Sequence, residues 1–296
     1  MRLQLALINS TLCGSLGLTF DRLPLLGMKQ PFFSIVTPVY NGSAFICTWI
    51  RSLLSQSFAD WESIIIDDGS VDNTFQDLLS AISGDQRFKI YRLGEESGPK
   101  LFPGPYKARN VGLFHACGKY ICFLDIDDYW LPNKLFDQYL LLCQSPTLEL
   151  VYGEYYKVDQ TLFRGYLKPR LDFIPIKWQI LFCNPVPMLT SCILADTAKR
   201  FQFQAVGHED YLYWRNIVNL LDASRISKTN GPAALYRCSH ESVSGDKIKV
   251  LLWWIKCYQR MGYPLAVAVV FLVLRVIMEV VEISLAKLGV FASYKH

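Results

Sequence analysis

The sequence predicts an α/β fold whose core is a mostly parallel, Rossmann-like sheet flanked by helices. Three short apolar runs, rich in β-branched and aromatic residues, each end in a polar turn, at residues 33–39, 62–66 and 120–124. Segments of helical character accompany them, at residues 44–57, 72–83 and 106–117. This alternation of strand and helix is typical of a parallel sheet buried on both faces, because crossover helices cover each face.

The run at residues 120–124 is followed at once by the carboxylates of Asp125, Asp127 and Asp128. Like charges at this spacing repel one another, and a bound cation relieves the repulsion. Hard divalent ions such as Mg²⁺ and Mn²⁺ are held by one or two carboxylates together with substrate phosphates. The pattern therefore predicts a metal–diphosphate site, and a solvated acidic turn in front of a helix is the alternative.

The other two runs end in comparable turns. The run at 62–66 leads into Asp67, Asp68, Gly69 and Ser70, and the first run leads into residues 40–42. Ligands of parallel α/β sheets bind at the carboxyl ends of the strands. We therefore expect all three turns to meet in one crevice.

Five motifs follow one another in the order and spacing found in the family 2 glycosyltransferases: residues 37–42, 67–70, 108–110, 123–128 and 209–210. Over about residues 32–245 the chain resembles these enzymes, which have the GT-A fold and use nucleotide-diphosphate sugars. The resemblance implies an inverting transferase acting on a saccharide or polyprenyl-linked acceptor. It also implies a place in bacterial O-antigen, capsule or lipopolysaccharide biosynthesis, in the cytoplasm or peripherally at the cytoplasmic face of the inner membrane.

The resemblance implies a nucleoside site in the first two turns. Pro38 would shape the first loop, Tyr40 would stack on the base, and Asp68 would accept a hydrogen bond from a pyrimidine N–H, as an ionised carboxylate can. Tyr40 could instead cover the core. For Asp67 we favour a cap of the turn beside Gly69.

Arg109 and Asn110 are implied as further donor-site residues, near a helix N-terminus where phosphate binding is favoured. Lys107, close by, reads as a surface lysine. Arg237 could bind the diphosphate through its guanidinium, or it could pair with a local carboxylate.

The resemblance also assigns roles within the acidic turn. Asp127 is implied as the residue that coordinates Mn²⁺ or Mg²⁺ directly. Asp125 is implied as its companion, facing the ribose or sugar of the donor. The metal would neutralise charge on the leaving nucleoside diphosphate.

Asp210 is implied as the catalytic base, with Glu209 supporting it or orienting the acceptor. Such a base removes a proton from the acceptor hydroxyl and must lie within hydrogen-bonding distance of it. The two carboxylates also suit a helix N-terminus, where the helix dipole favours negative charge. Both interpretations can hold together.

We divide the chain into an N-terminal extension (1–30), a GT-A domain (31–245) and a C-terminal helical segment (246–296). An upstream start codon could account for the extension. The domain comprises a nucleotide-sugar half (31–135) and an acceptor half (136–245), in which we expect strands at 150–153 and 155–163.

The C-terminal segment predicts a very apolar helix with a narrow polar stripe. Residues 264–274 are without charge, and Arg275, Glu279 and Glu282 then recur on one helical face. We interpret the segment as an interfacial anchor on a membrane surface. A docking or dimerising helix and a true membrane span are the alternatives, and charges within a span are costly.

Net charge and cysteine spacing bear on which classes of function and partner the sequence favours. The formal net charge is +4, and no dense basic stripe indicates a nucleic-acid partner. Nine cysteines are scattered without a CxxC pair, as in proteins with reduced thiols. A catalytically silent nucleotide-sugar-binding subunit and a sugar nucleotidyltransferase are the competing functions. The turn at 37–42 lacks the Gly-rich, basic loop expected of the latter.

Overall fold

The computed structural model describes residues 30–82, 84–94, 104–162, 164–168, 174–238, 247–288 and 293–295. Contacts between Cα atoms divide the chain into residues 1–30 and 31–296. The predicted N-terminal extension lies outside the described residues, apart from Gln30. Every helix and strand named below belongs to the second unit.

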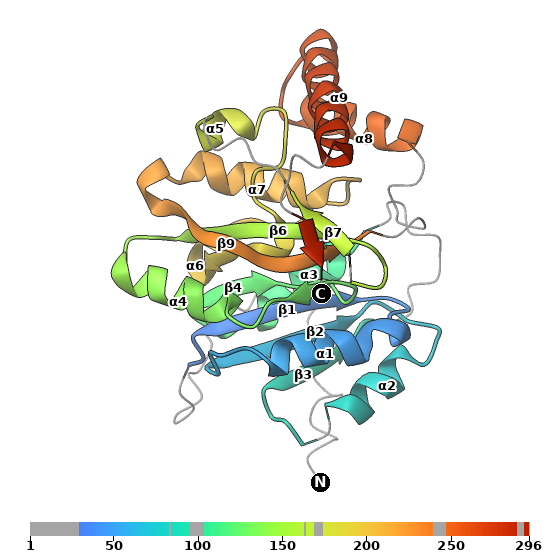
Figure 1. Cartoon of the computed structure of the whole chain (residues 1–296), viewed down its shortest axis with the longest axis vertical. Coiled ribbons are helices and arrows are strands. Elements are labelled where there is room, and N and C mark those ends of the chain that lie inside the picture. The colour runs from blue at the N-terminus through green and yellow to red at the C-terminus, as the bar shows by residue number, and fades with distance from the viewer. Residues whose placement is uncertain are drawn as a thin grey trace, which may run out of the picture. The chain divides into compact units, whose positions relative to one another are not determined.

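The strands of the described residues form one sheet, in the order β10-β7-β6-β8-β4-β1-β2-β3, with β9 pairing with β6 and β5 (Figure 1). Their bounds are β1 Phe33–Val39, β2 Trp61–Asp67, β3 Phe88–Arg92, β4 Tyr120–Phe123, β5 Tyr129–Trp130, β6 Leu150–Val158, β7 Arg164–Leu167, β8 Cys192–Leu194, β9 Ile226–Arg237 and β10 Ser293–Lys295. The helices are α1 Ile46–Leu54, α2 Thr74–Ala81, α3 Tyr106–His115, α4 Lys134–Gln144, α5 Ile176–Gln179, α6 Ala195–Ala198, α7 Glu209–Leu220, α8 Lys247–Arg260 and α9 Leu265–Lys287.

The predicted α/β fold is confirmed, and the nucleotide-sugar half contains three parallel strand pairs. There β1 pairs in parallel with β2 and β4, and β2 pairs in parallel with β3. The acceptor half adds β7 and β8 in antiparallel pairs and β9 in parallel with β6, and β10 of the C-terminal segment pairs antiparallel with β7, so the complete sheet is mixed. Helical crossovers connect parallel strands, whereas the short β6–β7 connection permits only a hairpin.

Both faces of the parallel strands are buried, which explains their unbroken apolar runs. Successive side chains alternate between two hydrophobic clusters, as with Ile121 on one face and Cys122 on the other. Helices α3 and α7 contribute to the first cluster, and α1 and α4 contribute to the second. A strand covered on both sides needs apolar residues at every position rather than at every second one.

Two strand expectations need correction. The expected strands at 150–153 and 155–163 are a single strand, β6, which continues through Glu154 and ends at Val158. The register of β6 against β9 shifts between Tyr152 and Tyr155, and this irregularity lets one strand run through the position where the sequence pattern predicted a break. Strand β3 was not predicted, because its burial is mixed and it lies at the end of the sheet, where the hydrophobic signal is weak.

The predicted C-terminal helical segment forms α8 and α9. Side chains of both helices join the first hydrophobic cluster, among them Trp254, Tyr258 and Ala268. Within the described part of the chain, no helix combines the length and the apolar character needed to cross a membrane.

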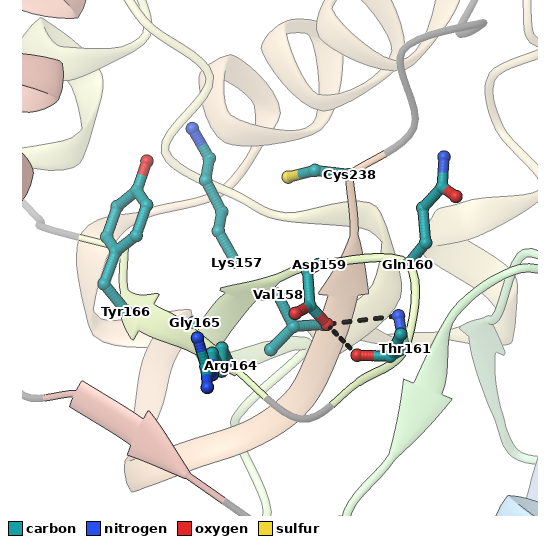
Figure 2. A pocket seen from close by; sticks show the side chains of 9 residues that line it. All are labelled: Lys157, Val158, Asp159, Gln160, Thr161, Arg164, Gly165, Tyr166 and Cys238. Carbon is teal, nitrogen blue, oxygen red and sulfur yellow. Dashed lines mark hydrogen bonds between the residues drawn. The ribbon is translucent and has the colours of Figure 1, made fainter.

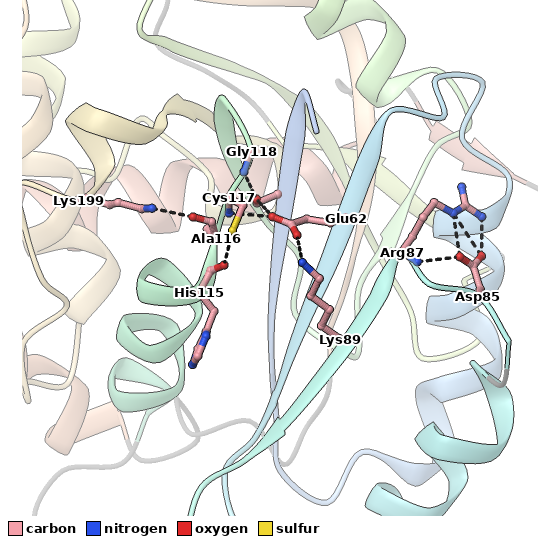
Figure 3. Close-up of polar contacts among 10 residues, drawn as sticks. Glu62, Asp85, Arg87, Lys89, His115, Ala116, Cys117, Gly118 and Lys199 are labelled. Carbon is pink, nitrogen blue, oxygen red and sulfur yellow. Dashed lines mark hydrogen bonds and ion pairs between the residues drawn. The ribbon is translucent and has the colours of Figure 1, made fainter. Parts of the chain in front are cut away.

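A polar cluster around Glu62 ties the amino ends of the parallel strands together, at the edge opposite the three turns (Figure 3). Glu62 Oε1 accepts hydrogen bonds from Ser34 Oγ at 2.5 Å and from the backbone N of Cys117 at 2.8 Å. Its Oε2 accepts one from Lys89 Nζ at 2.7 Å. The same Ser34 Oγ accepts from the backbone N of Gly118 at 2.7 Å. This one carboxylate thus connects β1, β2, β3 and the start of β4.

We predict that Glu62→Ala lowers the free energy of unfolding by about 2–3 kcal/mol, because buried donors on Ser34 and Cys117 lose their acceptor. Urea denaturation measures the change. Asp85→Ala is the matched control: the half-exposed Arg87–Asp85 pair, also in Figure 3, should be worth less than about 1 kcal/mol. Equal losses in the two variants would contradict the prediction.

Candidate active site

The turns after β1 and β2 are fastened to each other. The backbone N of Asn41 donates to Ser70 Oγ, and Asn41 Oδ1 accepts from the backbone N of Val71, both at 2.9 Å. Asn41 has a positive φ of 50°, which Asn tolerates better than most residues. The backbone N of Gly42 donates to Thr74 Oγ1 at the start of α2. The two predicted nucleoside-binding turns therefore form one unit.

Within this unit the predicted residues differ in accessibility. Asp67 is fully buried and its Oδ1 accepts from the backbone N of Ser70 at 2.9 Å, which confirms that it caps the turn. Pro38 is buried in β1, opposite Ile66 of β2. Tyr40 is 54% exposed, so its ring does not serve as core. Asp68 is half-buried, and its backbone N donates to the carbonyl of Val39.

Arg109 of α3 connects the acidic turn after β4 with the start of α7. Its Nη2 donates to both carboxylate oxygens of Asp125 at 2.9 Å, and its Nη1 donates to Glu209 Oε1 at 3.0 Å. The Arg109 side chain is 5% exposed, so the charge is nearly removed from water. The two carboxylates outweigh desolvation, the largest single influence, and the pKa of Arg109 is raised.

The two carboxylates at the start of α7 have different surroundings. Burial is the main cause that raises the pKa of Glu209 to about 7, with Arg109 opposing the shift. Asp210 is less buried, and its Oδ2 accepts from Asn184 Nδ2 at 3.0 Å. Both residues lie in the first turn of α7, where the helix dipole favours negative charge. Asp210 is thus an oriented carboxylate beside the residue that Arg109 ties to the acidic turn.

The remaining members of the acidic turn face Arg237 of β9. Asp128 is buried and its Oδ1 accepts from the backbone N of Arg237, while Arg237 Nε donates to the carbonyl of Asp127 at 2.8 Å. Burial first, and the charge of Asp125 second, raise the pKa of Asp127 to about 6. Arg237 also donates to the carbonyl of Gln160. The guanidinium therefore fixes the backbone that presents Asp127.

The acidic turn fits a hard divalent cation. Burial first, and then the charges of neighbouring acidic residues, raise the pKa values of Asp127 and Asp128, and Arg237 opposes these shifts only in part. Among the described residues, no three His, Cys, Asp or Glu side chains are grouped so as to hold a metal by themselves. A pair of carboxylates that leaves coordination positions for phosphate oxygens is the usual arrangement for Mg²⁺ and related ions.

Asn110, predicted at the donor site, is hydrogen-bonded to the backbone of Phe203. Its amide Nδ2 donates to the carbonyl of Phe203 and its Oδ1 accepts from the backbone N of Phe203, at 2.9 and 2.8 Å. These two bonds hold the loop that leads into α7. Asn110 therefore bears on the position of Glu209 and Asp210.

His208, directly before the two carboxylates, packs against α8. Its ring stacks on Trp254 with centroids 4.1 Å apart, and Nε2 is buried without a hydrogen-bond partner among the described residues. Burial lowers the pKa of His208 to about 4, so the ring is neutral at physiological pH. The sequence did not predict that Trp254 packs on His208, because nothing local indicates that α8 reaches this loop.

A pocket of about 520 Å³ lies between the β6–β7 hairpin and Cys238, next to Arg237 (Figure 2). Lys157, Arg164 and Tyr166 contribute to its wall. Gln160, whose carbonyl accepts from Arg237, lines it too. A cavity with basic side chains thus adjoins the acidic turn on the acceptor half.

The structure brings the predicted residues together in three groups. Arg109 joins Asp125 to Glu209 and hence to Asp210, and Arg237 lies beside Asp127 and Asp128. The third group, Pro38, Tyr40 and Asp68, belongs to the ends of β1 and β2, which pair with each other, and β1 also pairs with β4. Sequence reasoning missed the pairing of Asn184 with Asp210, which depends on a contact 26 residues apart.

Comparisons with known proteins point the same way. The family model described as Glycosyl transferase family 2 matches residues 34–192. The chain is 32% identical over 233 residues to the UDP-Glc:alpha-D-GlcNAc-diphosphoundecaprenol beta-1,3-glucosyltransferase WfgD of Escherichia coli. That match covers 76% of this chain and 84% of WfgD.

Solved structures confirm the GT-A fold. S. aureus TarS 1–349 in complex with UDP-GlcNAc superposes with a TM-score of 0.60 at 21% identity, over 82% of this chain and 71% of TarS. The mannosyltransferase PcManGT from Pyrobaculum calidifontis, in complex with GDP-Man and Mn2+, gives a TM-score of 0.58 at 16% identity, over 79% and 64% of the two chains. At these identities the likeness establishes the fold.

We predict that Arg109→Met lowers the free energy of unfolding by roughly 3–5 kcal/mol, because it leaves Asp125 and Glu209 without their buried partner. Adding Glu209→Gln should recover roughly 1–2 kcal/mol, since one uncompensated charge is then removed. Denaturant titration of wild type, both single variants and the double variant gives the coupling. Arg51→Met, at an exposed arginine, serves as the control, and strictly additive losses would contradict the ion-pair assignment.

We further predict that lowering the pH from 7.5 to 5 changes the free energy of unfolding about 2 kcal/mol less favourably in wild type than in His208→Phe, whose other titrating groups are the same. The unfolded chain takes up a proton near pH 6.5, whereas folded His208 does so only near pH 4, so unfolding is favoured as the pH falls between these values. Arg275 adds to this effect, and Asp210 and Glu279 oppose it. Urea denaturation of both proteins at the two pH values measures the difference, and equal changes in the two proteins would refute a neutral His208.

Proposed function

Because the chain belongs to glycosyl transferase family 2, we propose that it is an inverting enzyme that moves a sugar from a nucleotide-diphosphate sugar to a saccharide or polyprenyl-linked saccharide. The reaction serves the assembly of a bacterial cell-surface polysaccharide such as O-antigen, capsule or lipopolysaccharide. It takes place in the cytoplasm or at the cytoplasmic face of the inner membrane. The lipid-linked acceptor named for WfgD supports this acceptor class.

One arrangement carries the proposal: Arg109 ties the acidic turn at the carboxyl end of β4 to Glu209, the neighbour of Asp210. A transferase of this kind needs a carboxylate for the acceptor close to the residues that hold the donor diphosphate. The Arg109 bridge supplies that proximity from segments far apart in the sequence. The solved structures that bind UDP-GlcNAc or GDP-Man with Mn2+ support a donor of this class.

In the proposed reaction Asp210 accepts the proton of the acceptor hydroxyl while that oxygen forms a bond to the anomeric carbon of the sugar. The bond from this carbon to the diphosphate oxygen breaks, and its electron pair leaves with the nucleoside diphosphate. Attack opposite the leaving group inverts the anomeric configuration. Asn184 orients Asp210 through its 3.0 Å hydrogen bond, and Glu209 stays with Arg109.

The donor is held mainly by residues of the nucleotide-sugar half, 31–135. Tyr40 offers an exposed ring for the base and Asp68 a carboxylate for a pyrimidine N–H, while Pro38, buried near the end of β1, leads into the first turn. Asp125 and Asp127 would hold Mn²⁺ or Mg²⁺, which when bound neutralises charge on the departing diphosphate. Arg237 presents Asp127 through the backbone, and Asn110 fixes the loop before α7.

We expect one donor from a panel of UDP-, GDP- and dTDP-sugars to release nucleoside diphosphate with Mn²⁺ and a short-chain GlcNAc-diphosphate lipid. Asp210→Asn should lower turnover at least about 100-fold while donor binding persists, because only proton removal is lost. Asp127→Asn should weaken metal-dependent donor binding itself. Calorimetry and a diphosphate-release assay separate the two effects.

Asp137→Asn, on α4 away from the site, is the matched control and should retain activity. Donor binding without turnover, unchanged by Asp210→Asn across several acceptors, would instead assign the chain to a silent binding subunit. NMR of the product's anomeric configuration tests inversion, and a retained configuration would refute it.

A further inference from the structure

Helix α9 presents its apolar side chains outward. Valines and isoleucines at intervals of three and four residues are about half exposed, with exposed fractions of 56% for Val270, 51% for Val273, 52% for Ile277 and 57% for Val280. We call these four, with Leu265 and Ile283, the α9 apolar face. Among the exposed α9 side chains that the structure describes, Glu279 alone is charged. Water-soluble proteins seldom expose a continuous apolar patch of this kind unless it binds something.

Two charged residues of α9, Arg275 and Glu282, point the other way, into the protein. Glu282 is 8% exposed and pairs with Lys157 of β6 at 2.7 Å and with Lys168. The Arg275 guanidinium lies 3.5 Å from the ring centroid of Trp254 on α8. A helix at a protein–water boundary has the opposite arrangement, with charges outward and apolar residues inward. This arrangement suits apolar surroundings on the outer side of α9.

The chemistry of the α9 apolar face fits lipid better than a second protein. Its members are aliphatic, whereas the centres of protein interfaces are enriched in aromatic residues, methionine and arginine and carry regular hydrogen bonds. Acyl chains need neither shape-specific anchors nor hydrogen-bond donors. At about 1.5 Å per residue, the 23 residues of α9 give a helix roughly 34 Å long that can lie along a membrane surface.

The neighbouring helix α8 supplies charge of the matching sign. Its sequence contains four basic residues and no acidic one. Lys256 and Arg260 are exposed on it together with Leu251 and Leu252. Basic and apolar side chains interleaved on one helix favour an anionic lipid surface, where each cation near the headgroups adds to binding.

We propose that α8 and α9 form a docking surface for an anionic lipid bilayer, with the α9 apolar face entering the headgroup–acyl boundary and the α8 cations at the headgroups. The ion pairs of Glu282 hold α9 to the sheet while its other side contacts lipid. Trp254 of α8 stacks on His208, so the docking surface is packed directly against the segment that carries Glu209 and Asp210. This inference concerns membrane binding and does not depend on the transfer reaction.

Co-sedimentation of the full chain with vesicles of phosphatidylcholine, with and without phosphatidylglycerol, tests the proposal. Wild type should bind the anionic vesicles, and Val273→Asp/Ile277→Asp should bind at least about tenfold more weakly, since two exposed aliphatic side chains that would enter the lipid are replaced by charges. Leu79→Asp on α2, at a leucine that is 45% exposed, is the matched control and should bind as wild type does. Lys256→Gln/Arg260→Gln should reduce the preference for anionic vesicles.

Circular dichroism and thermal unfolding establish that each variant is folded. Failure of wild type to bind any vesicle, or binding unaffected by Val273→Asp/Ile277→Asp, would overturn the proposal. A concentration-dependent dimer in analytical ultracentrifugation that these two substitutions dissociate, without vesicle binding, would assign the face to a second copy. Nucleoside diphosphate release with a water-soluble acceptor reports separately on the proposed transferase, so failure of one hypothesis is distinguishable from failure of the other.

Discussion

Arg109 is a nearly buried cation that three chain segments must satisfy together. Its guanidinium lies between Asp125, which follows β4, and Glu209, which opens α7, and it belongs to α3. Taking such a charge out of water is costly, and the cost is met only when both carboxylates are correctly placed. The positions of β4, α3 and α7 are therefore mutually dependent. Asp210 takes its position from this arrangement, because it follows Glu209 in the first turn of the same helix.

Carboxylates at the amino ends of the parallel strands have different surroundings from those at the carboxyl ends. At the amino edge, Glu62 is fully engaged by Ser34, Lys89 and the backbone of Cys117. At the carboxyl edge, burial and then neighbouring acidic side chains raise the pKa values of Asp127 and Asp128, and Arg237 opposes these shifts only in part. The first arrangement stabilises the fold. The second leaves negative charge to be met by a cation, which is a property of a binding site.

Charged residues of the C-terminal helices also have partners within the domain. Glu282 and Arg275 turn toward the domain, so the cost of their burial is met by Lys157, Lys168 and Trp254. Lys157 also lines the pocket beside Arg237. A bilayer contacted by α9 would thus lie on the acceptor half of the molecule. An acceptor anchored in lipid would then have a short path to the acidic turn.

The sequence by itself determined the α/β class, the three strand–turn units and the residues at their ends, because strands, turns and helix starts are set by local patterns. Asp67 as a turn cap and α9 as an apolar helix with a polar stripe were readable for the same reason. The tertiary structure alone decided that Arg109 bridges Asp125 and Glu209, that Asn110 holds Phe203, and that Asn184 orients Asp210. It also decided that the polar stripe of α9 faces inward and the aliphatic side chains outward. Each of these depends on contacts between residues distant in the chain, and local periodicity shows that a helix has two faces without showing which of them the rest of the protein covers.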